Sequence, residues 1–114
     1  MAANRPSVFV WVVLTSGDFD VIRILADPLR ASIVELLASR AACVRHVVEH
    51  TGAKQPTVSH HLRALREAGL VTVVPEGRFT FYRLVPDAFE NAGMRLAELA
   101  ARAREALPES VRPG

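Results

Sequence analysis

Cysteine is nearly absent from this 114-residue chain, and so are long apolar runs. The one cysteine, Cys43, excludes an intramolecular disulfide and fits a reducing compartment. The longest apolar run covers residues 8–14, which is too short to cross a bilayer. A single Arg precedes this run and no A-x-A cleavage site follows it, which disfavours a signal peptide. We therefore expect a cytoplasmic protein without membrane contact.

Lysine is also scarce, because Lys54 is the only one and the other thirteen of the fourteen basic residues are Arg. The formal net charge is only +2, although the sequence pI is about 9.3. Arg binds phosphate and guanine bidentately better than Lys does, so nucleic acid is a permitted partner. Half of the residues are hydrophobic, and a chain of this length supports one domain with a core.

The chain divides into one central domain and two short ends. We expect residues 1–17 to form an N-terminal extension, residues 18–107 the folded domain and residues 108–114 a C-terminal tail. Within the extension, segment 8–14 is β-branched enough to be extended, and an amphipathic helix is the alternative. Extra dimer surface is the simplest role for this segment.

Three short helices are predicted before Gly52. The first covers about residues 19–26, and the second begins at Pro28, where Asp27 can cap its free N–H groups. The third covers about residues 42–51 and ends at Gly52, since glycine tolerates a positive φ. The expected inward residues of the second and third helices are Ile33, Leu36, Leu37, Val44, Val47 and Val48.

Residues 54–70 carry the pattern that says most about function. On a helix with about 100° per residue, Val58, Leu62 and Leu65 form one narrow apolar stripe. The opposite face is short, polar and partly basic, and its members are Pro56, Thr57, His60, Arg63, Ala64 and Glu67. Short hydrogen-bonding side chains can reach base edges without holding a helix away from a DNA groove. This pattern is typical of a recognition helix.

A hairpin is predicted directly behind this helix. The two helices around Gly52 are joined by about four residues, which is the helix-turn-helix pattern. Residues 71–74 and 79–84 are then rich in β-formers, and residues 75–78 supply the turn between them. A hairpin in this place is a wing.

A long last helix is predicted beyond Pro86. Its apolar stripe, rich in small residues, contains Phe89, Gly93, Leu96, Ala100, Ala103 and Leu107, flanked by Ala92 and Leu99. A two-fold partner is the commonest way to bury such a stripe in a small domain. We therefore predict a mainly α fold with a β-hairpin wing, a winged helix-turn-helix that dimerises through its terminal helices.

Several short motifs follow the order of these predicted elements. They are Ala26-Asp27-Pro28-Leu29-Arg30, Gln55-Pro56-Thr57-Val58-Ser59-His60-His61-Leu62, Leu65-Arg66-Glu67-Ala68-Gly69-Leu70, Gly77-Arg78 and Tyr82-Arg83-Leu84. Together they resemble the ArsR/SmtB family of bacterial winged-helix regulators, from about Asp20 to the last helix. The resemblance implies a homodimer that binds a roughly palindromic operator. It also implies an effector, often a metal ion, that changes the affinity for DNA.

The same resemblance points to the residues that would meet DNA. Base or phosphate contacts are implied for Gln55, Thr57, Ser59 and His60, and phosphate contacts for Arg63 and the wing residue Arg78. On the helical wheel His60 points outward, whereas His61 lies at the edge of the apolar stripe and is expected to be half-buried. The polar residues Thr57 and Ser59 could instead form only local hydrogen bonds.

Two departures from the family pattern concern DNA affinity. Lys54 stands where the family usually has Ser, so a side-chain cap is lost, and a docked phosphate would offset the charge that the helix dipole disfavours. Lys54 is therefore a candidate phosphate anchor. The wing carries Val74 and Pro75 where family members often have basic residues, which implies fewer phosphate contacts and a shallower salt dependence.

The metal sites usual in the family are incomplete in this sequence. Arsenic-sensing members open the third helix with C-V-C, and the matching residues are Cys43-Val44-Arg45, which disfavours arsenic or cadmium. Zinc sensors carry histidines on the last helix, and no histidine follows His61. Cys43, His46 and His50 remain within about 60° of arc on a helix. They suit nickel, slightly favoured, or zinc, and the N-terminus or a second subunit could add ligands.

Other readings of the same residues stay open. Cys43 could be a small buried hydrophobe that precedes the helix, or a redox switch whose thiolate Arg45 stabilises, independent of metal. The polar helix face could bind protein, as a winged-helix interaction module that acts with a co-regulator. An enzyme is not expected, because the histidines occupy outward positions without an evident cleft, oxyanion donors or orienting acid.

Overall fold

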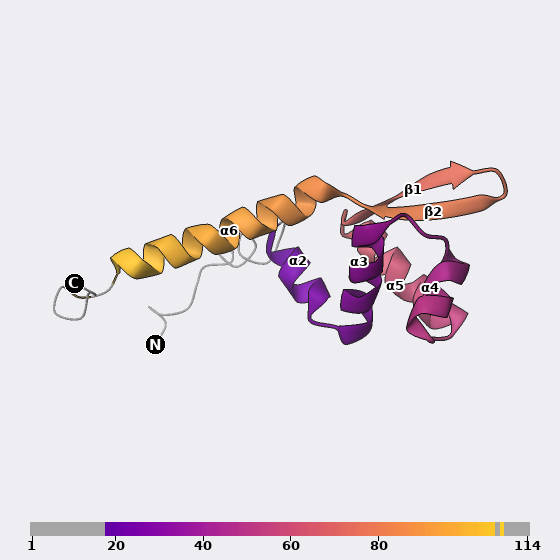
Figure 1. The fold of residues 1–114 in the computed structure, drawn as a ribbon. Coiled ribbons are helices and arrows are strands. Elements are labelled where there is room, and N and C mark those ends of the chain that lie inside the picture. The colour runs from indigo at the N-terminus through magenta and orange to yellow at the C-terminus, as the bar shows by residue number, and fades with distance from the viewer. Residues whose placement is uncertain (1–17, 107, 109–114) are drawn as a thin grey trace.

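Short helices, a hairpin and one long helix follow one another along the chain (Figure 1). This computed structural model describes residues 18–106 and 108. The element order is α2 (Asp18–Leu25), α3 (Pro28–Ser39), α4 (Val44–Thr51), α5 (Gln55–Glu67), β1 (Val71–Glu76), β2 (Phe79–Leu84) and α6 (Pro86–Glu105). The predicted mainly α fold with a hairpin wing is confirmed. The expected extension 1–17 and stripe residue Leu107 lie outside the described residues, as does nearly all of the expected tail.

Helix α3 begins where the sequence predicts, because Asp27 caps it. The Asp27 carboxylate accepts hydrogen bonds from the backbone N–H groups of Leu29 at 2.9 Å and Arg30 at 3.1 Å. Pro28 occupies the first turn, where a missing N–H costs nothing. The buried residues of this helix are Ile33, Val34, Leu36 and Leu37. The N-terminal end of α3 is therefore fixed by local hydrogen bonds.

Helix α4 begins two residues later than predicted, at Val44 rather than near residue 42. The backbone of Ala42 pairs instead with Tyr82 of β2, through N–H···O bonds of 3.1 and 2.8 Å. This pairing holds Ala42 extended and leaves Cys43 as the N-cap of α4. A residue whose backbone is held extended by such a bridge cannot also join the first turn of a helix, which explains the late start. The helix ends as predicted at Gly52, whose φ is +73°.

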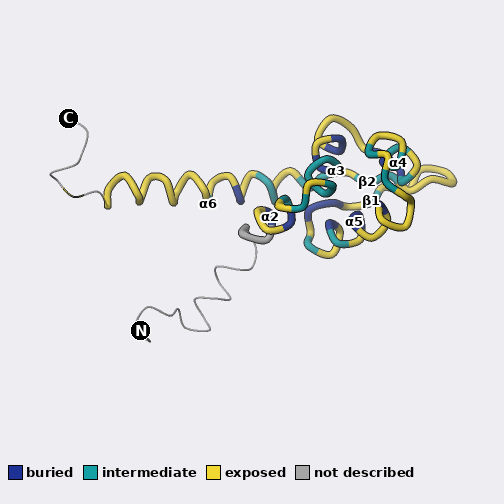
Figure 2. The backbone as a smooth tube through the Cα atoms, turned by 90° about the horizontal axis from the view of Figure 1, so that it is seen from below, coloured by how far each residue is buried: buried dark blue, intermediate teal, exposed yellow. Residues whose placement is uncertain are grey.

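The core lies where α3, α4 and α5 meet. Val58, Leu62 and Leu65 of α5 are fully buried, as are Ile33 and Val47 from the two other helices. Figure 2 shows this buried interior surrounded by exposed backbone turns. Each such side chain contributes about 1.5–3 kcal/mol through burial, so the apolar stripe of α5 fixes which face of this helix remains outside.

The hairpin is longer and tighter than predicted. Pro75 and Glu76 belong to β1, so the connection shrinks from four residues to Gly77 and Arg78. Gly77 has a φ of +61°, which suits the first position of a two-residue hairpin turn. In the antiparallel register Val71 pairs with Leu84, and both face the core cluster. The result is a narrow wing with its tip at Arg78.

Helix α6 leaves the body and extends beyond it (Figure 2). Ala92, near its start, is buried, whereas Leu96 and Leu99 farther along are 49% and 38% exposed. The base of α6 packs against α2, and most of the remainder has no neighbour within the described residues. None of the described helices combines the length and apolar character needed to span a membrane.

Candidate nucleic-acid interface

Helix α5 presents one polar face to solvent. Its predicted contact residues Gln55, Thr57, Ser59, His60 and Arg63 are all exposed, and so is Lys54 just before it. Val58 and Leu62 on the opposite face are fully buried, so the helix cannot rotate without opening the core. The structure thus brings the predicted side chains together on one fixed surface.

The start of α5 has no side-chain cap. Lys54 occupies the N-cap position with φ −72° and ψ 150°, and its side chain makes no capping hydrogen bond. Pro56 has no N–H, while Val58 N–H already donates to the Lys54 carbonyl at 3.0 Å. The N–H groups of Gln55 and Thr57 belong to the first turn, whose donors lack partners inside the helix. These donors, the helix dipole and the Lys54 ammonium all favour an anion at this end.

The wing contributes a single cation at its tip. Arg78 is exposed in the turn, and its neighbour Phe79 is 54% exposed. Val74 is 37% exposed on β1. The outer part of the wing therefore carries exposed apolar side chains and one cation, Arg78, while a second exposed cation, Arg83, lies near the base of β2.

His61 is more buried than its place at the edge of the stripe predicts. Only 8% of His61 is exposed, and its Nδ1 accepts a 2.9 Å hydrogen bond from Nε of Arg30 in α3. Its ring also lies 5.5 Å from the ring of His60, in an edge-on arrangement. The extra burial comes from α3, which packs Arg30 against this side of α5. His61 thus lies on the buried side of α5, and His60 lies on its exposed face.

Burial lowers the pKa of His61, and the nearby Asp27 carboxylate only partly offsets this effect. A neutral imidazole can accept at Nδ1, whereas an imidazolium has no free lone pair and would repel Arg30. The pKa of Asp27 is also lowered, mainly because its carboxylate accepts from the Arg30 backbone N–H. Asp27, Arg30 and His61 therefore form one charge-balanced contact between the start of α3 and the middle of α5. No local sequence pattern indicates this contact, since Arg30 and His61 lie 31 residues apart in the chain.

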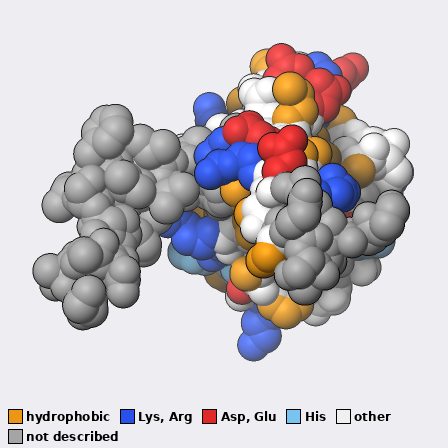
Figure 3. All heavy atoms as spheres, turned by 90° about the vertical axis from the view of Figure 1, so that its left-hand side faces the viewer, with side chains coloured by type: hydrophobic (Ala, Val, Ile, Leu, Met, Phe, Trp, Pro, Cys, Tyr) orange, Lys and Arg blue, Asp and Glu red, His pale blue; other side chains and the backbone are white. Residues whose placement is uncertain are grey.

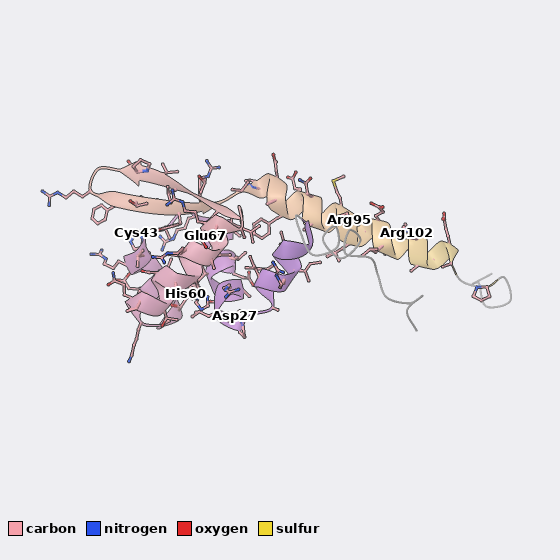
Figure 4. All side chains as sticks on the ribbon, turned by 180° about the vertical axis from the view of Figure 1, so that it is seen from behind. Asp27, Cys43, His60, Glu67, Arg95 and Arg102 are labelled. Atoms are coloured by element: carbon pink, nitrogen blue, oxygen red, sulfur yellow. The ribbon has the colours of Figure 1, made fainter. Side chains whose placement is uncertain are left out.

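The three candidate metal ligands are not gathered into one site. Cys43 and His46 line a small cavity of about 170 Å³ together with Arg45, Phe79 and Phe81, but His50 does not line it. Nδ1 of His46 is buried and has no hydrogen-bond partner among the described residues. Within that part of the chain, no three His, Cys, Asp or Glu residues are placed to hold a metal ion. Figure 4 shows Cys43 beside the hairpin, apart from His60 and Asp27.

Several known proteins are similar to this chain in fold and in sequence. The sequence profile described as bacterial regulatory protein, arsR family, matches residues 27–73. An HTH-type transcriptional regulator of Methanocaldococcus jannaschii is 38% identical over 69 residues, which cover 60% of this chain and 78% of that protein. The chain belongs to the ArsR family. As predicted from the motifs, it is therefore a DNA-binding transcriptional regulator of the ArsR/SmtB type and not an enzyme.

Two further members of the family are similar over most of the domain. The HTH-type transcriptional repressor SmtB of Mycobacterium tuberculosis is 39% identical over 82 residues, which cover 65% of this chain and 61% of that repressor. A solution structure from Mycobacterium bovis, described as a homodimeric winged helix-turn-helix DNA-binding domain, has a TM-score of 0.61 and 30% identity. That match covers 91% of this chain and 93% of the other.

Proposed function

We propose that this ArsR-family regulator acts as a homodimer that binds a roughly palindromic operator, with α5 in the major groove and the wing on the flanking backbone. The observation that carries the proposal is the fixed, exposed polar face of α5, with Gln55, Thr57, Ser59, His60 and Arg63, backed by a fully buried stripe. Lys54 at the helix start and Arg78 at the wing tip supply phosphate contacts. Two such faces, one from each subunit, would read two half-sites about one helical turn apart.

A titration of labelled duplex from the promoter region of the protein's own gene tests this function. We expect at least about a thousandfold preference over a scrambled duplex, because specific sites are bound that much more tightly than random DNA. Gln55→Ala should weaken specific binding roughly tenfold, since Gln can pair bidentately with adenine. The matched control is Asn91→Ala, which removes an exposed amide from α6. Equal affinity for both duplexes would overturn the proposal.

A second proposal concerns the effector, for which nickel or zinc is the candidate. The supporting observation is the Cys43 and His46 pair in one cavity, with Nδ1 of His46 buried and unpartnered among the described residues. Two ligands cannot complete the tetrahedral site that zinc prefers. A metal ion bound here would need further ligands, either His50 after a movement toward the cavity or side chains of the second subunit. The structure does not supply a complete set of ligands.

Calorimetric titration with nickel or zinc chloride checks the effector proposal. We expect binding to wild-type protein that is lost in Cys43→Ser and in His46→Gln, and a change in duplex affinity when metal is added. His50→Gln then decides whether this residue is the third ligand. No heat from wild-type protein with either metal would rule the proposal out. An oxidant response that persists in Cys43→Ser would likewise remove the redox alternative.

A protein co-regulator finds no support in the comparisons. The relatives reported above are described as regulators or repressors of transcription, or as a DNA-binding domain. The exposed face of α5 is accordingly assigned to DNA in this proposal.

A further inference from the structure

Arg30 lies outside the helix-turn-helix but touches the recognition helix. It occupies the first turn of α3, and its Nε donates to Nδ1 of His61 at 2.9 Å. The backbone N–H of Arg30 donates to the Asp27 carboxylate, so hydrogen bonds fix both the main chain and the side chain of Arg30. Because a bond to Nε fixes the plane of the guanidinium, the direction of its two terminal amino groups is fixed as well.

The charge of Arg30 acts on the nearby Asp27 carboxylate, but the terminal amino groups of Arg30 have no hydrogen-bonded partner among the described residues. A guanidinium has five N–H donors, and the bond to His61 uses one of them. Among the described residues, no hydrogen bond or ion pair occupies the remaining four. Two parallel donors of this kind match the oxygens of a phosphate. Asp27 already satisfies N–H groups at the start of α3, so the side chain of Arg30, and not the helix end, is the candidate contact.

The position of Arg30 places it beside the DNA-facing surface. His61, its partner, is in ring contact with exposed His60 on that surface. Figure 4 shows Asp27, the cap of the same helix turn, on the same side of the molecule as His60. In Figures 1 and 2, α5 lies between the α2–α3 turn and the tip of the hairpin. A phosphate strand borders each side of a major groove, so a cation held against α5, as Arg30 is through its bond to His61, is near the DNA backbone when α5 enters the groove.

We propose that Arg30 is a phosphate-binding residue outside the helix-turn-helix, and that His61 is the positioning residue that aims its guanidinium at the DNA backbone. This inference rests on the proposed DNA-binding function. The simpler alternative is that the Arg30–His61 bond only fastens α3 to α5. The proposal and this alternative predict different salt dependences of DNA binding, because only a phosphate contact releases counterions.

The test measures affinity for the promoter duplex at several salt concentrations. For Arg30→Gln we expect the slope of log K against log salt to become shallower by about 0.9 per subunit, or about 1.8 for a dimer. The control is Arg40→Gln, which removes an exposed Arg from the other end of α3, roughly 15 Å away along the axis. Its slope should match that of wild type. A folded Arg30→Gln protein with the wild-type slope would overturn the proposal.

A second variant isolates the positioning role. His61→Leu removes the acceptor but leaves the Arg30 charge, so we expect several-fold weaker binding with an unchanged slope. Unchanged affinity in this variant would show that His61 does not position Arg30.

Wild-type protein provides a check that does not depend on the folding of any variant. Phenylglyoxal modifies accessible Arg, and mass spectrometry maps the sites. We expect duplex to protect Arg30 and not Arg40, whereas equal modification of Arg30 with and without duplex would contradict the proposal. If wild-type protein binds no duplex at all, the proposed function itself fails, which is a different result from an unchanged slope.

Discussion

At the scale of single residues, the protonation of His61 makes the stability of the fold depend on pH. Its pKa in the folded state is lowered because α3 and α5 bury the ring. The groups that face it are Asp27 and Arg30 from the start of α3 and His60 from its own helix. An unfolded His has a pKa of about 6.5, so the unfolded chain takes up this proton first as the pH falls. Folding is therefore favoured above pH 6.5 and weakened as the pH falls through the folded pKa.

We predict that wild-type protein loses more stability between pH 7.5 and 5.5 than a His61→Gln variant does. Gln offers a carbonyl acceptor to Arg30 that does not titrate. The extra loss for one proton cannot exceed about 1.4 kcal/mol per pH unit. Urea denaturation at a series of pH values measures it. His50→Gln, which removes an exposed histidine, serves as the control for the loss of one imidazole. Parallel curves for wild type and His61→Gln would refute the assignment.

At the scale of single elements, the sequence predicts the features that depend on residues close together in the chain. The stripe of Val58, Leu62 and Leu65 correctly predicted the buried face of α5, because apolar spacing on a helix is a local property. The Asp27 cap was predicted for the same reason, since cap and helix are adjacent in the chain. The exposed face of α5 was predicted at the same time, because it is the side of the helix opposite the buried stripe.

Errors at the element scale arose mostly where distant segments meet. The start of α4 was predicted too early because the backbone pairing of Ala42 with Tyr82 joins segments forty residues apart. The wing turn was predicted too long, because Pro75 commonly marks a turn but here pairs with Thr80 in an edge position of the hairpin. The Arg30–His61 bond was missed although both residues stand in motifs that were noticed, since no spacing rule connects them. Two of the three misses are thus tertiary contacts without a local sequence signal, and the third is a local exception to the usual place of proline.

At the scale of the whole molecule, α6 is the element that most needs a partner. Leu96 and Leu99 are exposed on the stripe of this helix or at its edge, and Met94 on another side is 69% exposed. Figure 3, which looks at this end of the molecule, shows hydrophobic side chains interspersed with acidic and basic ones. In water the exposed stripe favours association, and a two-fold related α6 is the simplest surface of matching shape.

We predict that Leu96→Glu converts the proposed dimer into a monomer and thereby weakens DNA binding. A charge in the apolar contact would lose its hydration without gaining a partner, which disfavours association. A monomer contacts one half-site instead of two, so the apparent affinity for the full operator should fall by on the order of a hundredfold. Sedimentation velocity measures the mass, and the promoter titration measures the affinity. The matched control is Ala101→Glu, which adds the same charge at an exposed position about 140° around α6 from Leu96. This protein should remain dimeric and bind as wild type does, and a Leu96→Glu protein that does the same would remove α6 from the interface.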